Sequence, residues 1–359
     1  MQVSKKWIDR PQEVRSEDTL DLAVIREFLQ LHLPELEGEL RLQQFRGGAS
    51  NLTYLLQFDN AEFILRCPPK GTKAKSAHDM GREFRIMKQL KPVYPYVPVM
   101  IAFCEDTSLI GREFYIMEKL SGIIPRANLP KDMRFSPEQT RQLCLNVIDK
   151  LIELHQIEPE QAGLLQFGKG AGYAQRQIAG WSDRYRKAKT WNVPAARYIM
   201  DWLAANIPKT ERTCFIHNDF RFDNVVLDAA DPMQVIGVLD WEMATVGDPL
   251  MDLGNSLAYW VQADDDFIHK MLRRQPTHLP GMLTRNEVME YYCDKMGFRA
   301  RDFTFYEVYG LFRLAVIVQQ IYYRYYHGQT HNKAYRHFWI LANYLCWRCK
   351  RVIARANQN

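Results

Sequence analysis

Acidic and amide side chains recur at a short spacing in the second half of the chain. Residues 217–224 read HNDFRFDN, and DWE follows at residues 240–242. Asp219 and Asn224 bracket a loop before one apolar stretch, and Asp240 ends the next, so a hairpin would bring all three side chains to one edge. Oxygen ligands of this kind suit Mg²⁺, which shares its other positions with water and substrate phosphates. A further carboxylate that does not bind metal could accept a hydroxyl proton.

Short apolar stretches alternate with turn residues in the first third of the chain, which predicts an antiparallel meander. A glycine loop at residues 46–51 and the polar pair Asn60–Ala61 separate its first strands. The expected elements, in order, are a helix at 20–31, strands at 40–45, 52–59 and 63–66, a helix at 77–90 and a strand at 113–119. We therefore expect a small lobe made of a sheet and one key helix.

The remainder of the chain has a mainly helical pattern. Ser136 and Gln139 form a capping box with Pro137 at the first helical position, and apolar residues follow on one helical face. Two short apolar stretches, at 225–227 and 235–239, interrupt the helical pattern and are expected to be strands. They are the strands of the hairpin that the polar cluster requires.

Length and composition agree with a globular protein of two lobes. The chain has 359 residues, of which 47% are hydrophobic and 25% charged, and this excludes disorder for most of it. We expect an α+β protein with lobes at residues 1–121 and 122–359. No apolar run approaches the ~18–20 residues that span a bilayer, and residues 1–10 lack the apolar region of a signal peptide. We therefore expect a cytoplasmic protein that does not bind membranes.

Cysteine usage does not indicate a disulfide framework, because the seven cysteines are an odd number spread along a long chain. We expect free thiols. The pair Cys346 and Cys349, in the sequence CWRC, could indicate redox or metal chemistry, but no second pair accompanies it. The favoured interpretation is that Cys346 and Cys349 are simply two positions on one face of a C-terminal helix.

Charge is distributed unevenly along the chain. The net charge is +5, yet no Asp or Glu follows Glu307, while eight Lys and Arg residues do. Residues 1–310 therefore carry 39 basic and 42 acidic residues, a net charge of −3. The basic C-terminal segment is also rich in aromatic residues, and it is either a solvated helix face or a surface for an anionic partner.

The order of these motifs resembles that of the protein-kinase-like fold: a glycine loop, a strand ending at Arg66, a helix with Glu83, a strand ending at Glu118, and then H-x-D-x₄-N. The stretches HNDFRFDN and VLDWEMATVGDPLMDLG look more narrowly like the aminoglycoside phosphotransferase and choline kinase superfamily. The stretches L-R-x-P-P, A-H-D-x-x-R-E and D-W-E-x-A-x-x-G-D-P are similar to those of phosphotransferase domains found beside or fused to acyl-CoA dehydrogenases. The resemblance extends from about Leu40 to Arg324 and implies a bilobal α+β kinase.

For the polar cluster, the resemblance implies that Asp219 is the catalytic base that orients and deprotonates an acceptor hydroxyl. It implies that Asn224 and Asp240 hold Mg²⁺ against the phosphates of ATP. His217 is expected to bond the loop backbone, and Asp252 to brace the same loop at a helix start. Asn218 stands where glycine is common in this superfamily.

For the nucleotide, the resemblance implies three contact regions. In the first, Gly47, Gly48, Ser50 and Asn51 form a loop whose backbone N–H groups approach phosphates, although a plain hairpin turn has the same appearance. The second is Arg66, which replaces the usual lysine, with Glu83 as its ion-pair partner. The third is the adenine-binding segment, in which backbone groups of Glu118 and Leu120 contact the base and Met117 lines the pocket.

Other catalytic motifs are absent from the sequence. There is no G-x-x-x-x-G-K-[ST], no G-x-S-x-G and no H-E-x-x-H, which argues against P-loop NTPases, serine hydrolases and zincins. The glycine-rich residues 168–172 are interpreted as a loop, because no strand precedes them.

We therefore expect an ATP- and Mg²⁺-dependent kinase of a small molecule. The basic C-terminal helices favour an anionic or neutral acceptor, such as a hydroxyacyl-CoA or hydroxy acid, over an aminoglycoside or choline. Two other interpretations stay open. One is a pseudokinase that binds nucleotide and regulates a partner, and the other is an interaction module for nucleic acid, which the absence of any nucleic-acid motif disfavours.

Overall fold

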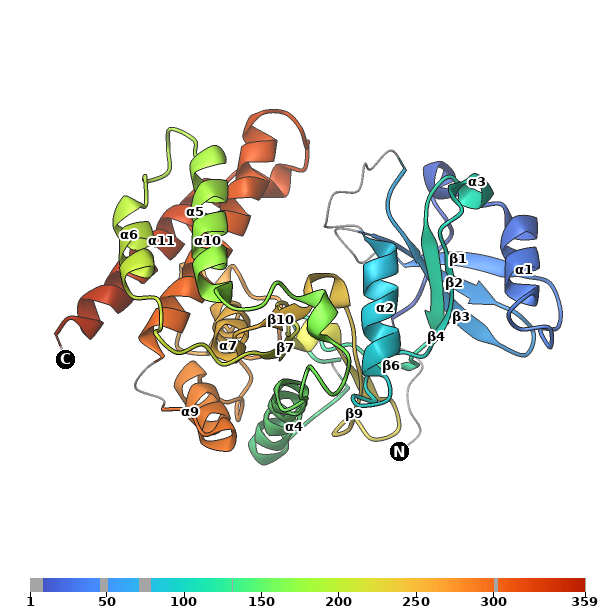
Figure 1. Ribbon diagram of the computed structural model, residues 1–359, viewed down its shortest axis with the longest axis horizontal. Coiled ribbons are helices and arrows are strands. Elements are labelled where there is room, and N and C mark those ends of the chain that lie inside the picture. Colours follow the sequence, from blue (N-terminus) through green and yellow to red (C-terminus); the bar gives the residue numbers. More distant parts are fainter. Residues whose placement is uncertain (1–8, 46–50, 71–78, 131, 300–302, 359) are drawn as a thin grey trace. The chain divides into compact units, whose positions relative to one another are not determined.

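Figure 1 shows the computed structural model of the chain, which describes residues 9–45, 51–70, 79–130, 132–299 and 303–358. Packing divides the chain into two compact units. The first unit comprises Met1–Pro125, Ala162–Leu164 and Asn224–Ala244, and the second comprises Arg126–Gln161, Leu165–Asp223 and Thr245–Asn359. A small antiparallel sheet in the first unit and a mainly helical second unit confirm the α+β class.

The first unit is built on a five-stranded antiparallel sheet with the strand order β1-β2-β3-β5-β4 (Figure 1). Arg66 pairs with Thr53 on one side and Tyr115 on the other, so it lies on the central strand. The strand bounds are Arg41–Phe45 for β1, Leu52–Gln57 for β2, Glu62–Cys67 for β3, Met100–Cys104 for β4 and Phe114–Glu118 for β5. Four of these strands were predicted. The fifth, β4, was not, because it is a short edge strand with an irregular register after a segment rich in proline.

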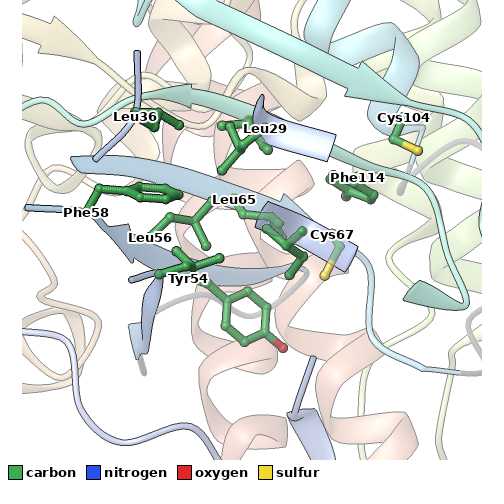
Figure 2. Close-up of a cluster of buried hydrophobic side chains, with 12 residues drawn as sticks. Leu29, Leu36, Tyr54, Leu56, Phe58, Leu65, Cys67, Cys104 and Phe114 are labelled. Atoms are coloured by element: carbon green, nitrogen blue, oxygen red, sulfur yellow. The ribbon is translucent and has the colours of Figure 1, made fainter. Parts of the chain in front are cut away.

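Helix α1 (Leu22–Gln30) and strands of the sheet share one hydrophobic core (Figure 2). Leu29 of α1 packs with alternate residues of the strands, such as Tyr54 and Leu56 on β2, because every second side chain of a strand points to the same face. The hydroxyl of Tyr54 donates to the carbonyl oxygen of Asp18 at 2.8 Å, which pairs its buried polar atom. The core thus fixes the register of the strand that carries Arg66.

Helix α2 (Met80–Leu90) begins at Asp79, whose carboxylate accepts a hydrogen bond from the N–H of Arg82 at 2.7 Å. Its buried residues recur at helical spacing, and Glu83 is among them. The first unit also contains a three-stranded sheet of order β6-β8-β9, with β6 at Gly122–Ile123, β8 at Val225–Asp228 and β9 at Val235–Val238. Strands β8 and β9 form the predicted hairpin.

The second unit is a set of helices around the two-stranded antiparallel sheet of β7 (Cys214–Ile216) and β10 (Thr245–Gly247). Its helices are α4 (Pro137–His155), α5 (Tyr173–Lys187), α6 (Arg197–Ala205), α7 (Pro249–Ala258), α8 (Phe267–Lys270), α9 (Arg285–Met296), α10 (Thr304–Tyr326) and α11 (Phe338–Ala356). The capping box at Ser136 and Gln139 is confirmed. Within the described ranges, no helix has both the length and the apolar character that crossing a membrane requires.

Helices α7 and α10 approach each other backbone to backbone. A Cβ atom at Gly254 would lie 2.4 Å from the carbonyl oxygen of Tyr306, and one at Gly310 would lie 2.0 Å from the carbonyl oxygen of Gly254. Only glycine fits these two positions without displacing a helix. The close crossing fixes α7, which carries Asp252.

All seven cysteines are buried free thiols, as expected from their number and spacing. Cys346 and Cys349 both lie on α11, which confirms the interpretation of CWRC as two positions on one helix. Burial raises the pKa of the Cys346 thiol to about 11, so this thiol is protonated at neutral pH and weakly nucleophilic.

Candidate active site

The segment between β7 and β8 holds the HNDFRFDN motif, and a buried carboxylate fixes its backbone. The N–H groups of His217 and Asn218 donate to the two carboxylate oxygens of Asp252, at 2.7 and 2.8 Å. Asp252 lies in the first turn of α7 and is completely buried. The structure thus confirms that Asp252 braces this loop, which we call the catalytic loop (residues 217–224).

Asp252 is itself held by a chain of buried hydrogen bonds. Nε2 of His155 lies 3.1 Å from Oδ2 of Asp252, and Nδ1 of His155 lies 2.5 Å from the hydroxyl of Tyr292. Burial alone would raise the pKa of the Asp252 carboxyl, but the hydrogen bond from His155 and that from the N–H of His217 hold the pKa below its usual value. The carboxylate is therefore charged at neutral pH, and charge-assisted hydrogen bonds are the stronger kind.

The backbone of Asn218 has the left-handed conformation, with φ of 66°. Glycine enters this region without cost, and asparagine is among the few other residues that tolerate it, which explains why asparagine can replace the glycine common here. The carbonyl oxygen of Asn218 accepts a hydrogen bond from Arg313 at 3.0 Å. Nδ1 of His217 accepts one from the N–H of Asp219 at 3.2 Å, so His217 does bond the loop backbone, as expected.

The Asp219 carboxylate lies beside an arginine that the sequence analysis did not assign. Nη2 of Arg221 is 3.1 Å from Oδ2 of Asp219, and Nε of Arg221 is 3.3 Å from Oδ1 of Asp223. The guanidinium group of Arg221 also lies over the ring of Tyr259, 4.8 Å from its centre. The Asp219 side chain is 21% exposed, so a reactant can reach it. The only sequence signal for Arg221 was its place two residues after Asp219.

In the first unit, Arg66 joins two acidic residues. Nη1 of Arg66 lies 2.7 Å from Oε1 of Glu83, and Nη2 lies 3.4 Å from Oδ1 of Asp240. Burial alone would lower the pKa of the Arg66 guanidinium, but the carboxylate of Glu83 raises it well above its usual value. The ion pair expected from the spacing of Arg66 and Glu83 is therefore present, and it orients a permanently charged fork of donors.

Asn224 and Asp240 lie at the two ends of the β8–β9 hairpin. The N–H of Leu239 donates to the carbonyl oxygen of Asn224 at 2.8 Å, which ties these ends together. Asn224 is buried, whereas the Asp240 side chain is 33% exposed and its backbone is left-handed, with φ of 69°. Aspartate, like asparagine, enters this region more often than most residues, and left-handed residues other than glycine cluster at functional positions.

Asn224 has an amide oxygen and Asp240 a carboxylate, and both are ligand types that Mg²⁺ binds. Mg²⁺ commonly binds one or two protein oxygen ligands and completes its shell with water and phosphates. Across the part of the chain that the structure describes, no group of three or more His, Cys, Asp or Glu residues could hold a metal ion.

Asn51 is the one described residue of the expected phosphate loop. Its Nδ2 donates to Oε2 of Glu242 at 3.3 Å, and its side chain is buried. Gly47, Gly48 and Ser50 lie outside the described residues. Glu242 was not among the expected site residues, although it belongs to the DWE motif.

The expected adenine segment follows β5. Met117 is buried in that strand. The N–H of Glu118 already donates to the carbonyl oxygen of Val99 at 2.8 Å, so only the carbonyl group of Glu118 could contact a base. Leu120 packs over Gly237 of β9, where a Cβ atom would lie 2.3 Å from Cδ1 of Leu120. The absence of a side chain at Gly237 thus makes room for Leu120.

The structure brings Arg66, Glu83 and Asp240 together in the first unit, where Asn224 ends the same hairpin as Asp240. Asp219 lies in the second unit with Arg221. The HNDFRFDN motif is divided between the units, because Asp223 belongs to the second unit and Asn224 to the first. The roles of these residues in binding ATP and metal stay predictions.

Comparison with known proteins assigns the chain to a family. Residues 41–285 match the profile of the phosphotransferase enzyme family, abbreviated APH. This match covers more than half of the chain and includes every site residue that the sequence predicted. The chain belongs to the phosphotransferase enzyme family.

The relatives found by sequence are larger proteins. The chain is 36% identical over 295 residues to acyl-CoA dehydrogenase family member 10 of Mus musculus, which covers 82% of this chain and 27% of that protein. It is 33% identical over 327 residues to acyl-CoA dehydrogenase family member 11 of Homo sapiens, covering 89% of this chain and 41% of that protein. The chain thus spans well under half of the length of these relatives.

Solved structures confirm the kinase-like fold. A candidate aminoglycoside phosphotransferase from Ralstonia eutropha has a TM-score of 0.79 and 27% identity, with 94% of this chain and 99% of that chain covered. Choline kinase from Cryptosporidium parvum has a TM-score of 0.66 at 12% identity, with 94% and 97% covered. The complex of streptomycin, ATP and APH(2")-IIa has a TM-score of 0.55 at 17% identity, with 84% and 90% covered. The fold is thus kinase-like, and the family is that of phosphotransferase enzymes.

Proposed function

We propose that the chain transfers the γ-phosphoryl group of ATP to a hydroxyl group of a small molecule, and that Mg²⁺ assists. Its family supports phosphoryl transfer, and the related APH(2")-IIa and APH(4)-Ia structures contain ATP and AMP-PNP, which supports ATP as the donor. Both structures also contain an aminoglycoside, which supports a small molecule as the acceptor.

In this proposal, Asp219 orients the acceptor hydroxyl and takes its proton as the oxygen attacks the γ-phosphorus. The backbone bonds to Asp252 hold the catalytic loop in one conformation before substrate binds, which removes an entropic cost from the reaction. Arg66, oriented by Glu83, binds phosphate oxygens. Asn224 and Asp240 would hold Mg²⁺, which when bound offsets the negative charge of the phosphates.

The charge around Asp219 indicates the class of acceptor, and this is the observation that carries the proposal furthest. Arg221 lies 3.1 Å from Asp219. The buried Arg313 donates to the carbonyl oxygen of Asn218, the residue before Asp219. The carboxylates of Asp219 and Asp223 pair with Arg221, and the buried Arg313 adds a further permanent positive charge, which disfavours a polycation such as an aminoglycoside. We therefore propose an anionic or neutral acceptor.

The relatives suggest a narrower class. They are acyl-CoA dehydrogenase family members, and acyl-CoA molecules are anionic through their phosphates. A hydroxyacyl-CoA or a free hydroxy acid combines an alcohol with negative charge, which the environment of Asp219 favours over positive charge. We propose this class as the acceptor.

Release of ADP from ATP, measured with and without Mg²⁺, tests the proposal against a panel of hydroxyacyl-CoAs, hydroxy acids, aminoglycosides and choline. We expect Mg²⁺-dependent turnover with a member of the first two classes only. The Asp219→Asn variant should lose turnover and still bind ATP in calorimetry. Undiminished turnover in that variant would refute the role of Asp219, and turnover with an aminoglycoside would refute the argument from charge. ATP binding without turnover on any acceptor would favour a pseudokinase.

A further inference from the structure

Arg313 of helix α10 is a buried arginine without a carboxylate of its own. It is 5% exposed, and its Nη2 atom donates to the carbonyl oxygen of Asn218 at 3.0 Å. Its guanidinium group lies 5.2 Å from the ring centre of Trp181. Within the described ranges Arg313 forms no ion pair, whereas the guanidinium groups of Arg66 and Arg221 each pair with two acidic residues. A permanent positive charge beside the catalytic loop is thus left without an acidic partner.

The surroundings of Arg313 keep it charged but do not pair it. Burial alone would lower the pKa of its guanidinium group, but the nearby Tyr309, Tyr259 and Asp219 raise the pKa above its usual value. Among the described residues, the bond to Asn218 is its one hydrogen bond. A buried charge without a partner is unfavourable, and an oxygen atom of a ligand would supply that partner.

The free N–H groups of Arg313 are accessible to a ligand. In the described part of the chain, the completely buried polar atoms that lack a hydrogen bond include nitrogen atoms of Arg66 and Arg112, but none of Arg313. Since Nε and Nη1 of Arg313 also have no hydrogen-bond partner there, they lie on the small exposed part of the residue. Guanidinium nitrogens only donate, so they suit a carbonyl or carboxylate oxygen.

These donors lie close to the proposed base. The carbonyl oxygen that Arg313 bonds belongs to the peptide bond between Asn218 and Asp219. Burial, and next to it the charge of Asp219, raises the pKa of Tyr259, whereas Arg313 and Arg221 oppose this shift, so the three charges surround one ring. A short molecule can therefore reach both Asp219 and Arg313.

We propose that Arg313 binds the acyl oxygen of the acceptor and thereby favours hydroxy acids or their thioesters over plain alcohols. The inference rests on the proposed function, because it takes the hydroxyl of the same molecule to lie at Asp219. A carboxylate gains an ion pair and hydrogen bonds from Arg313, and the carbonyl oxygen of a thioester gains hydrogen bonds alone. The two sources of an acyl oxygen are therefore distinguishable by experiment.

Calorimetry on the full chain without ATP tests this role with two matched pairs of probes. The first pair is 3-hydroxybutyrate and 2-butanol, in which a methyl group replaces the carboxylate. The second pair is 3-hydroxybutyryl-CoA and CoA, which lacks the acyl group. We expect the acyl compound of at least one pair to bind about tenfold more tightly than its partner, and that pair identifies the acid or the thioester as the source. No preference in either pair would overturn the proposal, whatever the variants show.

Variants assign the preference to Arg313. Arg313→Gln should remove most of the about tenfold preference, and Arg313→Lys, which keeps the charge but not the fork of donors, should retain part of it. Arg324→Gln, an exposed change on the same helix, should leave the preference unaltered. If Arg313 only braces the catalytic loop, Arg313→Gln would keep the preference, and this result would refute the proposal. Arg313→Lys replaces Arg313→Gln if the latter does not fold.

Failure of this inference differs from failure of the proposed function, because binding is measured without turnover. A preference that Arg313→Gln loses, together with no ADP release on any acceptor, would refute the kinase proposal and leave the role of Arg313 standing. ADP release with equal use of 3-hydroxybutyrate, 3-hydroxybutyryl-CoA and 2-butanol would support the kinase proposal and refute the role of Arg313.

Discussion

Replacing Asp252 by asparagine should destabilise the second unit strongly. The carboxylate accepts from the N–H groups of His217 and Asn218 at 2.7 and 2.8 Å, and every one of these atoms is buried. Asparagine keeps one oxygen, and its NH₂ group would face an N–H donor. A hydrogen bond to a charged group contributes about 1.5–3 kcal/mol, and an unpaired buried donor costs about 1–3 kcal/mol more. We therefore expect Asp252→Asn to lower the free energy of unfolding by about 3–5 kcal/mol.

The pH dependence gives this prediction a second test. The pKa of Asp252 is lowered in the folded chain. The ionised carboxylate therefore contributes to stability above the unfolded pKa of about 3.9, and this contribution is lost as pH falls through the folded pKa. The difference in unfolding free energy between the unaltered chain and Asp252→Asn should therefore be constant near neutral pH and shrink below about pH 4.

Urea unfolding followed by circular dichroism at several pH values measures both quantities. Asp201→Asn is the matched control, because Asp201 is exposed on α6 and its replacement should change stability by no more than about 0.5 kcal/mol. If Asp252→Asn is as harmless as Asp201→Asn, the argument that Asp252 holds the catalytic loop is wrong. The same variant should also lose ADP release, since the loop that carries Asp219 would no longer be fixed.

Three further perturbations follow from buried groups. Arg66→Met leaves the Glu83 carboxylate buried without its cation and should cost about 3–5 kcal/mol in urea unfolding, and adding Glu83→Gln should recover part of it. Gly254→Ala should destabilise the fold by about 1–3 kcal/mol because the new Cβ atom meets backbone atoms. Gly180→Ala in helix α5, whose Cβ atom would have no contact under 3.7 Å, should instead stabilise the fold by about 0.5–1 kcal/mol. Thermal melts of the two variants show whether the effects have these opposite signs. Burial raises the pKa of Asp248 to about 6, so its charged form opposes folding, and this group alone should lower stability by about 2–3 kcal/mol from pH 4 to pH 7. A shallower fall in Asp248→Asn would support this assignment, and an unchanged slope would contradict it.

The sequence predicted the parts of the fold that have a local pattern. The strands that carry Arg66 and its neighbours are short apolar stretches between turn residues, and the helix after Ser136 has an explicit start signal. Strands β7 and β10 were not predicted, because three residues are too few to show a period and their partner lies about thirty residues away in sequence. Short strands of this kind exist only because the surrounding helices place them side by side.

The site was predictable where residue type and spacing specify a chemical role. The positions of Asp219, Asn224 and Asp240 could be named from the sequence, as could the pairing of Arg66 with Glu83. The contacts of Arg221 could not, because they depend on Tyr259, which follows it by 38 residues and meets it only in the folded chain. The partners of a long side chain depend on the folded environment more than on its neighbours in sequence.

The hydrogen bonds behind the catalytic loop also bear on how the protein folds. Asp252 joins the loop to His155, which is 97 residues away, and His155 joins Tyr292, which is 137 residues away. Contacts between such distant segments close large loops of chain and form late during folding. During synthesis, the loop cannot reach its final conformation until the chain has been made as far as α9. The proposed activity would therefore appear only after most of the second unit has assembled.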